Sequence, residues 1–365
     1  MKHFVPALSM LGVGSGLALA IAFAFPAGIL HSPVDLSPFP VAEHPPIEET
    51  MPQEQANLLF VGDMMLDRSV YALVQKADDF WYPFKHLSTF FPEYDLRIGN
   101  LEGPVTTFPS VAQTSRFTFT FDPEYVAPLA EYFDVLSLAN NHTHNFGRDG
   151  LRQTREFLGD ADILHFGDPY NTAGLLSTTT EVNGVRLGFV GYHELHGSGF
   201  EHVVEEVRAI DEDVDVLFVL PHWGIEYERE RPSAAQINAA HALIDAGADV
   251  IVGAHPHVVQ PIERYNDGVI FYSLGNFIFD QYFSEDTMEG LAVGLSVLVE
   301  ESTTTLAFEL RPIDIGRSSQ PSLASIEETE EMRAFLSRTA IGVSDEERAD
   351  IRRGHFTLVR GANNE

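Results

Sequence analysis

Six short apolar runs along the chain each end in polar residues, and this repeated pattern organises the sequence. The runs cover residues 58–61, 96–98, 135–138, 216–220, 249–252 and 269–274. Short apolar runs bounded by turn residues are typical of strands buried on both faces. Residues 232–246, with Pro232 early and Gly247 at the end, favour a helix before the fifth run. The pattern therefore predicts an α/β fold.

The residues that follow these runs are carboxylates, amides and imidazoles. They are Asp63, Asn100, Glu102, Asn141, His142, His222, His255, His257 and Asn276. Ligands of open α/β sheets bind beyond the carboxyl ends of the strands, so we expect these side chains to meet at one site. Nitrogen and oxygen ligands without sulfur suit Mn, Fe, Zn or Mg. We therefore predict a site for two divalent metal ions that activate a bridging water as nucleophile.

Each side chain at this site has a predicted role. The predicted metal ligands are Asp63, Glu102, Asn141, His222, His255 and His257. His142 is the candidate catalytic residue, as proton donor or oxyanion contact, and Arg68, Asn100 and Asn276 are candidates to bind substrate. Two alternatives stay open: Arg68 could be a surface ion-pair partner, and the polar cluster at 140–145 could be a turn stabilised by Asn side chains.

Several neighbouring segments have simpler interpretations. Asp67 is expected to be a solvated acid at a helix start, and His193 and His196 are expected at the rim or surface. The alternation of polar and apolar residues in 106–121 favours an edge hairpin or an excursion near the site mouth. Residues 262–274 predict a hairpin with its turn at 266–268.

The N-terminus indicates export. Residues 4–30 carry no charge and are long enough to span a bilayer. Residues 22–24 read Ala-Phe-Ala, which also fits the cleavage site of a signal peptide. Both interpretations place the rest of the chain outside the cytoplasm, either at the cell membrane or secreted; a buried core helix is the alternative. Residues 31–56 are predicted to be a Pro-rich linker, 57–315 the folded domain, and 316–365 a peripheral helical extension.

Composition excludes some classes of partner and site. The formal net charge is −32, from 54 acidic and 22 basic residues. A polyanionic protein is a poor match for nucleic acid, so we expect no nucleic-acid partner. The chain has no Cys, which excludes disulfides and thiolate metal sites.

Six motifs in order carry a family resemblance. They are GDMMLDR at 62–68, NLE at 100–102, ANNH at 139–142, HWGIEY at 222–227, GAHPH at 253–257 and SLGNF at 273–277. Across residues 57–315 the chain resembles the CapA family of capsule or poly-γ-glutamate synthesis proteins, within the calcineurin-like metallophosphoesterase superfamily. The resemblance implies a four-layer α/β/β/α sandwich with a dinuclear metal site. The chain differs from the superfamily pattern at Met65, where a histidine is common, and at Glu102, which replaces a bridging aspartate.

The resemblance also implies a biological setting. We expect a membrane-tethered or secreted protein of capsule or poly-γ-glutamate synthesis or export, acting beside membrane subunits that make or export the polymer. The leading hypothesis is a metal-dependent hydrolase whose substrate is a phosphoester or an acidic polymer. A non-catalytic accessory subunit is the alternative, and a soluble phosphatase is disfavoured by the apolar N-terminus.

Overall fold

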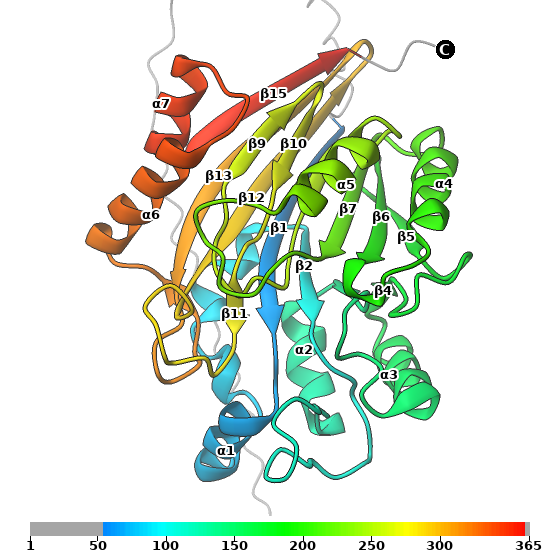
Figure 1. The fold of residues 1–365 in the computed structure, drawn as a ribbon, viewed down its shortest axis with the longest axis vertical. Helices are drawn as coiled ribbons and strands as arrows, with labels where there is room; N and C mark the ends of the chain where they lie inside the picture. The colour runs from blue at the N-terminus through cyan, green and yellow to red at the C-terminus, as the bar shows by residue number, and fades with distance from the viewer. Residues whose placement is uncertain (1–53, 362–365) are drawn as a thin grey trace, which may run out of the picture. The chain divides into compact units, whose positions relative to one another are not determined.

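The computed structural model describes residues 54–361, so the expected apolar segment at 1–30 and most of the linker lie outside the described residues. Within the described range, two β-sheets form a mixed α/β fold (Figure 1). The first sheet contains β1 (Glu54–Met64), β2 (Leu96–Leu101), β3 (Val135–Ser137), β4 (Leu164–Phe166), β11 (Asn276–Ile278), β12 (Glu289–Glu300), β13 (Thr303–Asp314), β14 (Ser322–Leu323) and β15 (His355–Gly361). Its order is β14-β13-β12-β1-β2-β3-β4, with β11 paired to β1 and β15 to β13.

The second sheet has parallel strands at its centre. It contains β5 (Ser177–Val182), β6 (Val185–His193), β7 (Val216–His222), β8 (Val250–Val252), β9 (Ile262–Tyr265) and β10 (Gly268–Phe271), in the order β5-β6-β7-β8-β10-β9. Strands β9 and β10 pair antiparallel, so the predicted hairpin is confirmed. All six predicted strands exist, but β1, β2 and β3 lie in the first sheet and β7, β8 and β10 in the second. The predicted site is therefore shared between two sheets.

Seven α-helices and five single-turn 3₁₀ helices occur between residues 54 and 361. The α-helices are α1 (Arg68–Ala77), α2 (Val126–Tyr132), α3 (Gly147–Asp160), α4 (Phe200–Asp211), α5 (Ala234–Ile244), α6 (Ile326–Thr339) and α7 (Asp345–Arg353). The 3₁₀ helices are η1 (Tyr82–Phe84), η2 (Leu87–Thr89), η3 (Phe91–Glu93), η4 (Pro123–Tyr125) and η5 (Glu194–His196). The predicted helix before β8 is confirmed as α5, which begins with a capping box between Ser233 and Gln236.

Buried hydrophobic side chains hold the two sheets and their helices together. Phe60 of β1 and Phe218 of β7 belong to a cluster between the sheets, with ring centroids 4.9 Å apart. The preceding residue of β1, Leu59, points the other way, into a cluster with α1, α2 and α3. Leu217 of β7 likewise belongs to a cluster with α4 and α5. Burial on both faces explains why these strands appear in the sequence as continuous apolar runs.

The C-terminal residues contribute a strand as well as helices. Figure 1 shows α6 and α7 lying beside β13 and β15. The sequence predicts a helical extension here but not β15, which pairs antiparallel with β13 over the whole length of β15. Phe335 of α6 and Phe356 of β15 join the cluster between the sheets. The local sequence pattern could not predict the pairing of β15, because its partner strand β13 lies far away in the sequence.

Residues 106–121 form a loop and not a hairpin. A parallel bridge between Val105 and Phe121 closes this excursion. Side chains of this segment bond to its own backbone, as where Thr106 Oγ1 accepts the N–H of Phe108 at 3.0 Å. Ser and Thr side chains that satisfy nearby polar groups compete with a strand ladder, which accounts for the loop.

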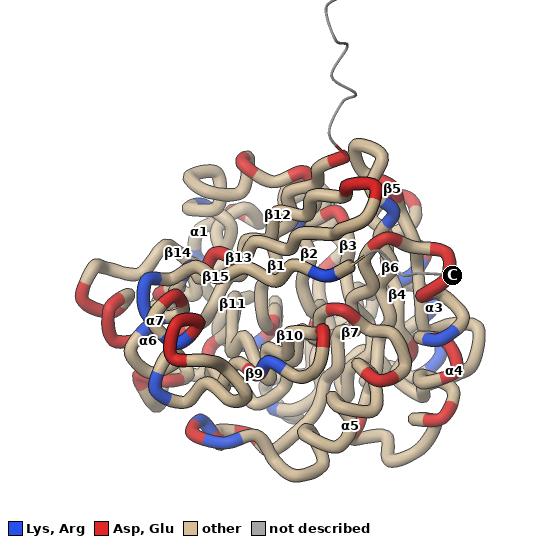
Figure 2. The backbone as a smooth tube through the Cα atoms, turned by 90° about the horizontal axis from the view of Figure 1, so that it is seen from above, with Lys and Arg blue, Asp and Glu red and all other residues tan. Residues whose placement is uncertain are grey.

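The acidic residues are dispersed over the described surface. Figure 2 shows Asp and Glu positions spread over loops and helices on all visible sides, with fewer Lys and Arg positions among them. Among residues 54–361, no helix combines the length and the hydrophobicity needed to cross a membrane.

Candidate metal centre

Strand register brings the predicted polar residues together. In the first sheet, Asp63 of β1 pairs with Asn100 of β2 and with Asn276 of β11. In the second sheet, His222 at the end of β7 lies opposite His193 of β6. The carboxyl ends of strands from both sheets therefore converge, and the ligand candidates meet there.

The most deeply buried group consists of Asp63, Glu102 and His222. One ligand atom of each lies within 4.8 Å of the other two. Glu102 is 0% exposed, and neither of its carboxylate oxygens has a hydrogen-bond partner among the described residues. Burial and the neighbouring Asp63 carboxylate raise the pKa of Glu102 well above its usual value. A buried carboxylate without partners is costly, and a divalent cation is the natural partner for it.

A chain of amides fixes the orientation of this group. Asn140 Oδ1 accepts hydrogen bonds from two backbone N–H groups, so its Nδ2 donates to Asn100 Oδ1 at 3.0 Å. Asn100 Nδ2 then donates to Asp63 Oδ1 at 2.7 Å and lies 3.4 Å from His222 Nδ1. His222 Nε2 lies 2.9 Å from Asn141 Oδ1, so these two predicted ligands already face each other. Asn100, predicted to bind substrate, is buried behind the ligands.

The protonation pattern of His142 follows from its neighbours. Asn145 Oδ1 accepts the backbone N–H of Phe119 at 2.7 Å, so His142 Nδ1, 3.1 Å from the same oxygen, must donate to it. Burial lowers the pKa of His142 to about 4. The neutral ring therefore presents an unprotonated Nε2, which lies 3.8 Å from Glu102 Oε1. His142 can accept a proton there, and it must do so before it can act as a proton donor.

The GAHPH loop after β8 has a strained backbone. His255 and His257 have φ angles of 95° and 58°, in the left-handed region that costs a non-glycine residue about 1–3 kcal/mol. The loop is held by the His255 N–H, which donates to Asp63 Oδ2 at 3.1 Å. A Cβ at Gly253 would collide with the carbonyl oxygen of Tyr272, so the loop also requires glycine there. His255 Nδ1 is buried and has no hydrogen-bond partner within the described range.

Asn276 orients His257. Asn276 Nδ2 donates to the carbonyl of Thr287 at 2.9 Å and to Gln281 Oε1 at 3.1 Å, which turns its Oδ1 toward His257 Nδ1 at 3.0 Å. His257 Nδ1 therefore carries the proton, and Nε2 points toward Glu102 Oε1 at 3.8 Å. The amide of Asn276, a predicted substrate contact, is thus already bonded to protein groups. Such partners commonly orient metal-binding histidines.

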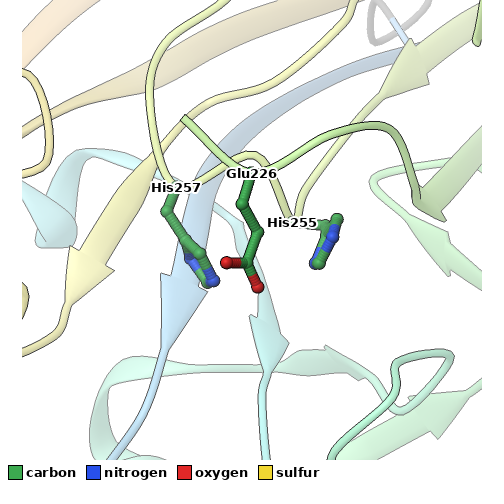
Figure 3. A group of neighbouring side chains, drawn as sticks. All are labelled: Glu226, His255 and His257. Carbon is green, nitrogen blue, oxygen red and sulfur yellow. The ribbon is translucent and has the colours of Figure 1, made fainter. Parts of the chain in front are cut away.

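Glu226 joins the site although the predicted ligand set omits it. Figure 3 shows its carboxylate lying between the rings of His255 and His257. One ligand atom of each of these three residues lies within 4.8 Å of the other two, and Glu226 is exposed. The signal in the sequence is weak: Glu226 follows His222 by four residues inside the HWGIEY motif.

The expectation that His193 lies at the rim is wrong. His193 is 2% exposed, and its ring centroid lies 6.1 Å from that of His222. Strand β6 extends through residue 193, and this carries the side chain inward. His193 Nδ1 donates to the carbonyl of Pro169 at 2.8 Å, and its Nε2 has no partner among the described residues. His196 is exposed, as expected.

Asp67 and Arg68 are both engaged by the protein. Asp67 is 1% exposed and not solvated, because it caps α1 and accepts hydrogen bonds from Arg68 N, Ser110 Oγ and Thr120 N. Arg68 forms an ion pair with Asp280, and only 16% of its side chain is exposed. Arg68 is therefore an ion-pair partner of another protein side chain, as the alternative interpretation of this residue expects.

An open groove of about 1040 Å³ adjoins the site. Arg68, Arg116, Phe117 and Tyr227 are among its lining residues. Arg116 and Phe117 are exposed, and the ring centroid of Tyr227 lies 6.2 Å from that of His257. Tyr227 therefore lies between the groove and His257, and arginine and aromatic side chains line the groove; none of the six predicted metal ligands lines it.

Comparison with known proteins identifies the family. The model of the family described as "Bacterial capsule synthesis protein PGA_cap" matches residues 57–281. The PGA biosynthesis protein CapA of Bacillus subtilis is 34% identical over 298 residues, covering 76% of each chain. The chain belongs to the PGA_cap family. The capsule biosynthesis protein CapA of Bacillus anthracis is 29% identical to this PGA_cap protein over 333 residues, covering 84% of this chain and 80% of the other.

A more distant structural likeness is also found. A hypothetical protein from Thermus thermophilus superimposes on this PGA_cap protein with a TM-score of 0.42 and 16% identity, covering 73% of this chain and 96% of the other. A likeness at this level says nothing about chemistry.

The donor set of this PGA_cap protein fits divalent metal ions. Burial lowers the pKa of His222 well below its usual value and that of His255 to about 3, so both imidazoles are neutral at physiological pH. Neutral imidazoles together with carboxylates are the forms that bind Mn, Fe or Zn. The unpartnered oxygens of Glu102 and the unpartnered Nδ1 of His255 are consistent with such an ion.

Proposed function

We propose that this chain is a metal-dependent hydrolase in the synthesis or export of an acidic capsule polymer, acting on poly-γ-glutamate or on a phosphoester. The observation that carries the proposal is the buried, unpartnered carboxylate of Glu102 beside Asp63 and His222. The names of the Bacillus relatives, which refer to PGA and capsule biosynthesis, supply the biological setting. Its partners would be the membrane subunits that make or export the polymer.

We also infer a four-layer α/β/β/α sandwich of the metallophosphoesterase type. The cluster between the sheets and the helix-lined clusters on their outer faces support this architecture. Two divalent ions, when bound, would acidify a water molecule and neutralise charge on the attacked group. The residues that would hold them are Asp63, Glu102, Asn141, His222, His255 and His257.

The remaining site residues have separate tasks. Asn100 and Asn276 orient Asp63 and His257 through the hydrogen bonds described above. His142 accepts a proton at Nε2 and returns it to the leaving group, because its Nδ1 is held by a neighbouring amide oxygen. Arginine side chains along the groove would bind carboxylate or phosphate groups of the substrate.

Residues 1–30 would serve as a membrane anchor or an export signal. The uncharged run at 4–30 supports this assignment. The folded domain would then lie outside the cytoplasm, held at the cell membrane or released. This location suits a protein that meets a capsule polymer.

One observation favours a non-catalytic accessory role. Met65 is fully buried, and its Sδ accepts the backbone N–H of Asp67 at 3.1 Å. A histidine is common at this position in the metallophosphoesterase pattern, so one nitrogen ligand is missing. In that role the site would bind metal or polymer without turnover.

The test is hydrolysis by full-length protein loaded with Mn²⁺. Bis(p-nitrophenyl) phosphate and poly-γ-glutamate are the substrates, and His222→Gln removes a buried ligand. His355→Gln, at an exposed position on β15, is the matched control. We expect the His222 variant to lose at least about 100-fold in rate, since even indirect partners of a metal contribute about 10–100-fold.

The other outcomes separate the alternatives. Bound metal without hydrolysis of either substrate would favour the accessory role. Equal rates for the His222 and His355 variants, with both proteins folded, would refute the assigned centre.

A further inference from the structure

We propose that Glu226 is a metal ligand, and that it forms with His255 and His257 a second, solvent-facing cation position. Its three ligands differ from those of the buried position formed by Asp63, Glu102 and His222, and the two positions are neighbours, since His257 Nε2 lies 3.8 Å from Glu102 Oε1. The inference rests on the metal-dependent function proposed above. It adds a ligand that the sequence motifs do not identify, and it assigns different accessibility to the two positions.

Backbone pairing delivers Glu226 to the two imidazoles. The Trp223 N–H donates to the carbonyl of Ala254 at 3.1 Å, and the Tyr227 N–H donates to the carbonyl of Pro256 at 2.8 Å. Pro256 lies between the two histidines, so the residue before Tyr227 is fixed beside both rings. Tyr227 has a φ of 68°, a strained conformation that this pairing maintains. The position of the carboxylate is therefore built into the loop.

The atoms around this position are ready to bind a cation. His257 Nδ1 is committed to Asn276, which leaves the Nε2 lone pair free. His255 is 3% exposed, and its Nδ1 has no hydrogen-bond partner among residues 54–361. An unpartnered buried nitrogen is costly unless something binds it. The exposed carboxylate of Glu226 supplies a negative charge beside the two imidazole rings.

The two positions differ in their access to solvent. All three ligands of the inner position are buried, whereas the outer position includes an exposed carboxylate. Tyr227, the neighbour of Glu226, lines the open groove. An ion at the outer position would therefore exchange with solvent more readily, and it would be the ion that meets a substrate in the groove.

The ligands indicate the class of metal. Two imidazoles and one carboxylate with open positions suit divalent Fe, Zn or Mn and are poor ligands for Ca²⁺. The outer ion would keep coordination positions free for water or for an anionic group of the substrate.

Metal titration of the full chain tests the inference. Metal-free protein is titrated with Mn²⁺ in a calorimeter, and bound metal is measured independently after dialysis. Wild type should show two classes of site. Glu226→Gln should weaken one class at least about tenfold and leave the other unchanged, because even indirect metal partners contribute about 10–100-fold.

Glu228→Gln is the matched control, because it removes the same charge from an exposed position of the same loop. If the Glu226 and Glu228 variants both bind two ions as wild type does, the inference is wrong while the proposed function stands. If wild type binds no metal, the inference and the proposed function are both wrong. His222→Gln should show the reverse pattern, with the inner class lost and the outer retained; loss of both classes in that variant would contradict two separate positions.

Discussion

Replacing Glu102 by Gln should stabilise the metal-free protein while abolishing the stabilisation that comes from metal at the inner position. In the absence of an ion, the carboxyl group is fully buried beside Asp63, and neither oxygen has a partner among the described residues. Gln has nearly the same shape, carries no charge, and offers an N–H group that can donate to the Asp63 carboxylate. The substitution thus removes the free-energy cost of burying an unpaired carboxylate, which destabilises the native chain only when no ion is bound.

The expected size follows from the cost of burying an unsatisfied polar group. That cost is about 1–3 kcal/mol, which corresponds to a rise in Tm of about 1–4 °C for a chain of this length. Metal at 1,000 times its Kd stabilises a protein by about 4.1 kcal/mol per site. Wild type gains this stabilisation at the inner position and the Gln variant does not. The order of stability should therefore invert between chelator and metal.

Thermal unfolding followed by circular dichroism measures both states, with EDTA or with saturating Mn²⁺. Because the pKa of Glu102 is raised, its carboxyl group is protonated at low pH, and the cost of burying its charge disappears there. The advantage of the Gln variant in EDTA should accordingly shrink as pH falls toward the usual carboxyl pKa. A variant that is less stable than wild type in EDTA, or that responds equally to Mn²⁺, would refute the reasoning.

Three further predictions concern residues around the centre. Asp67→Ala should lower the free energy of unfolding, measured with urea, by about 2–3 kcal/mol, because it removes a helix cap and leaves buried donors unpaired. A decrease of less than about 0.5 kcal/mol would contradict the role of Asp67 as a buried cap. Gly62→Ala should lower the free energy of unfolding by about 1–3 kcal/mol and weaken metal binding, because the added Cβ would collide with the carbonyl oxygen of Gly275. The control Gly159→Ala places its Cβ in open space, so it should neither lower the free energy of unfolding nor weaken metal binding. In EDTA, Tm should fall as pH drops from 6.5 toward 4, because burial lowers the pKa of His193 to about 4 and protonation of His193 then favours the unfolded chain. The Tm of His193→Gln should fall less over the same pH range. An equal decrease in Tm for wild type and this variant would refute the role of His193.

Local pattern predicted the elements whose signals are local. Helix α7 lies in the C-terminal segment that was predicted to be helical, and α5 lies within the predicted helix at 232–246. The strand runs are also found, because burial on both faces leaves an uninterrupted apolar signature. The family motifs correctly predicted the family, and five of the predicted metal ligands fall in the two clusters that could hold an ion.

What escaped prediction depends on contacts between distant segments. The division of six strands between two sheets and the addition of β15 are set by register with strands far along the chain. Glu226 was missed because a backbone bond from Tyr227 to the GAHPH loop brings it to the site. His193 was misplaced because the strand continues two residues past its apolar run. In each case the deciding interaction leaves no periodic trace in the sequence.

The charge of the site bears on how such an acidic protein could hold an acidic polymer. The chain carries a formal net charge of −32. Asp63, Glu102 and Glu226 carry at most three negative charges at the centre, and two divalent ions would bring four positive ones, so the local charge becomes positive when both ions are bound. Poly-γ-glutamate should therefore bind the Mn²⁺-loaded protein and not the EDTA-treated one, and salt should weaken the binding. Co-sedimentation with the polymer measures this, with Glu226→Gln reducing retention and Glu228→Gln leaving it unchanged. Equal retention with and without metal would place the polymer site away from the centre.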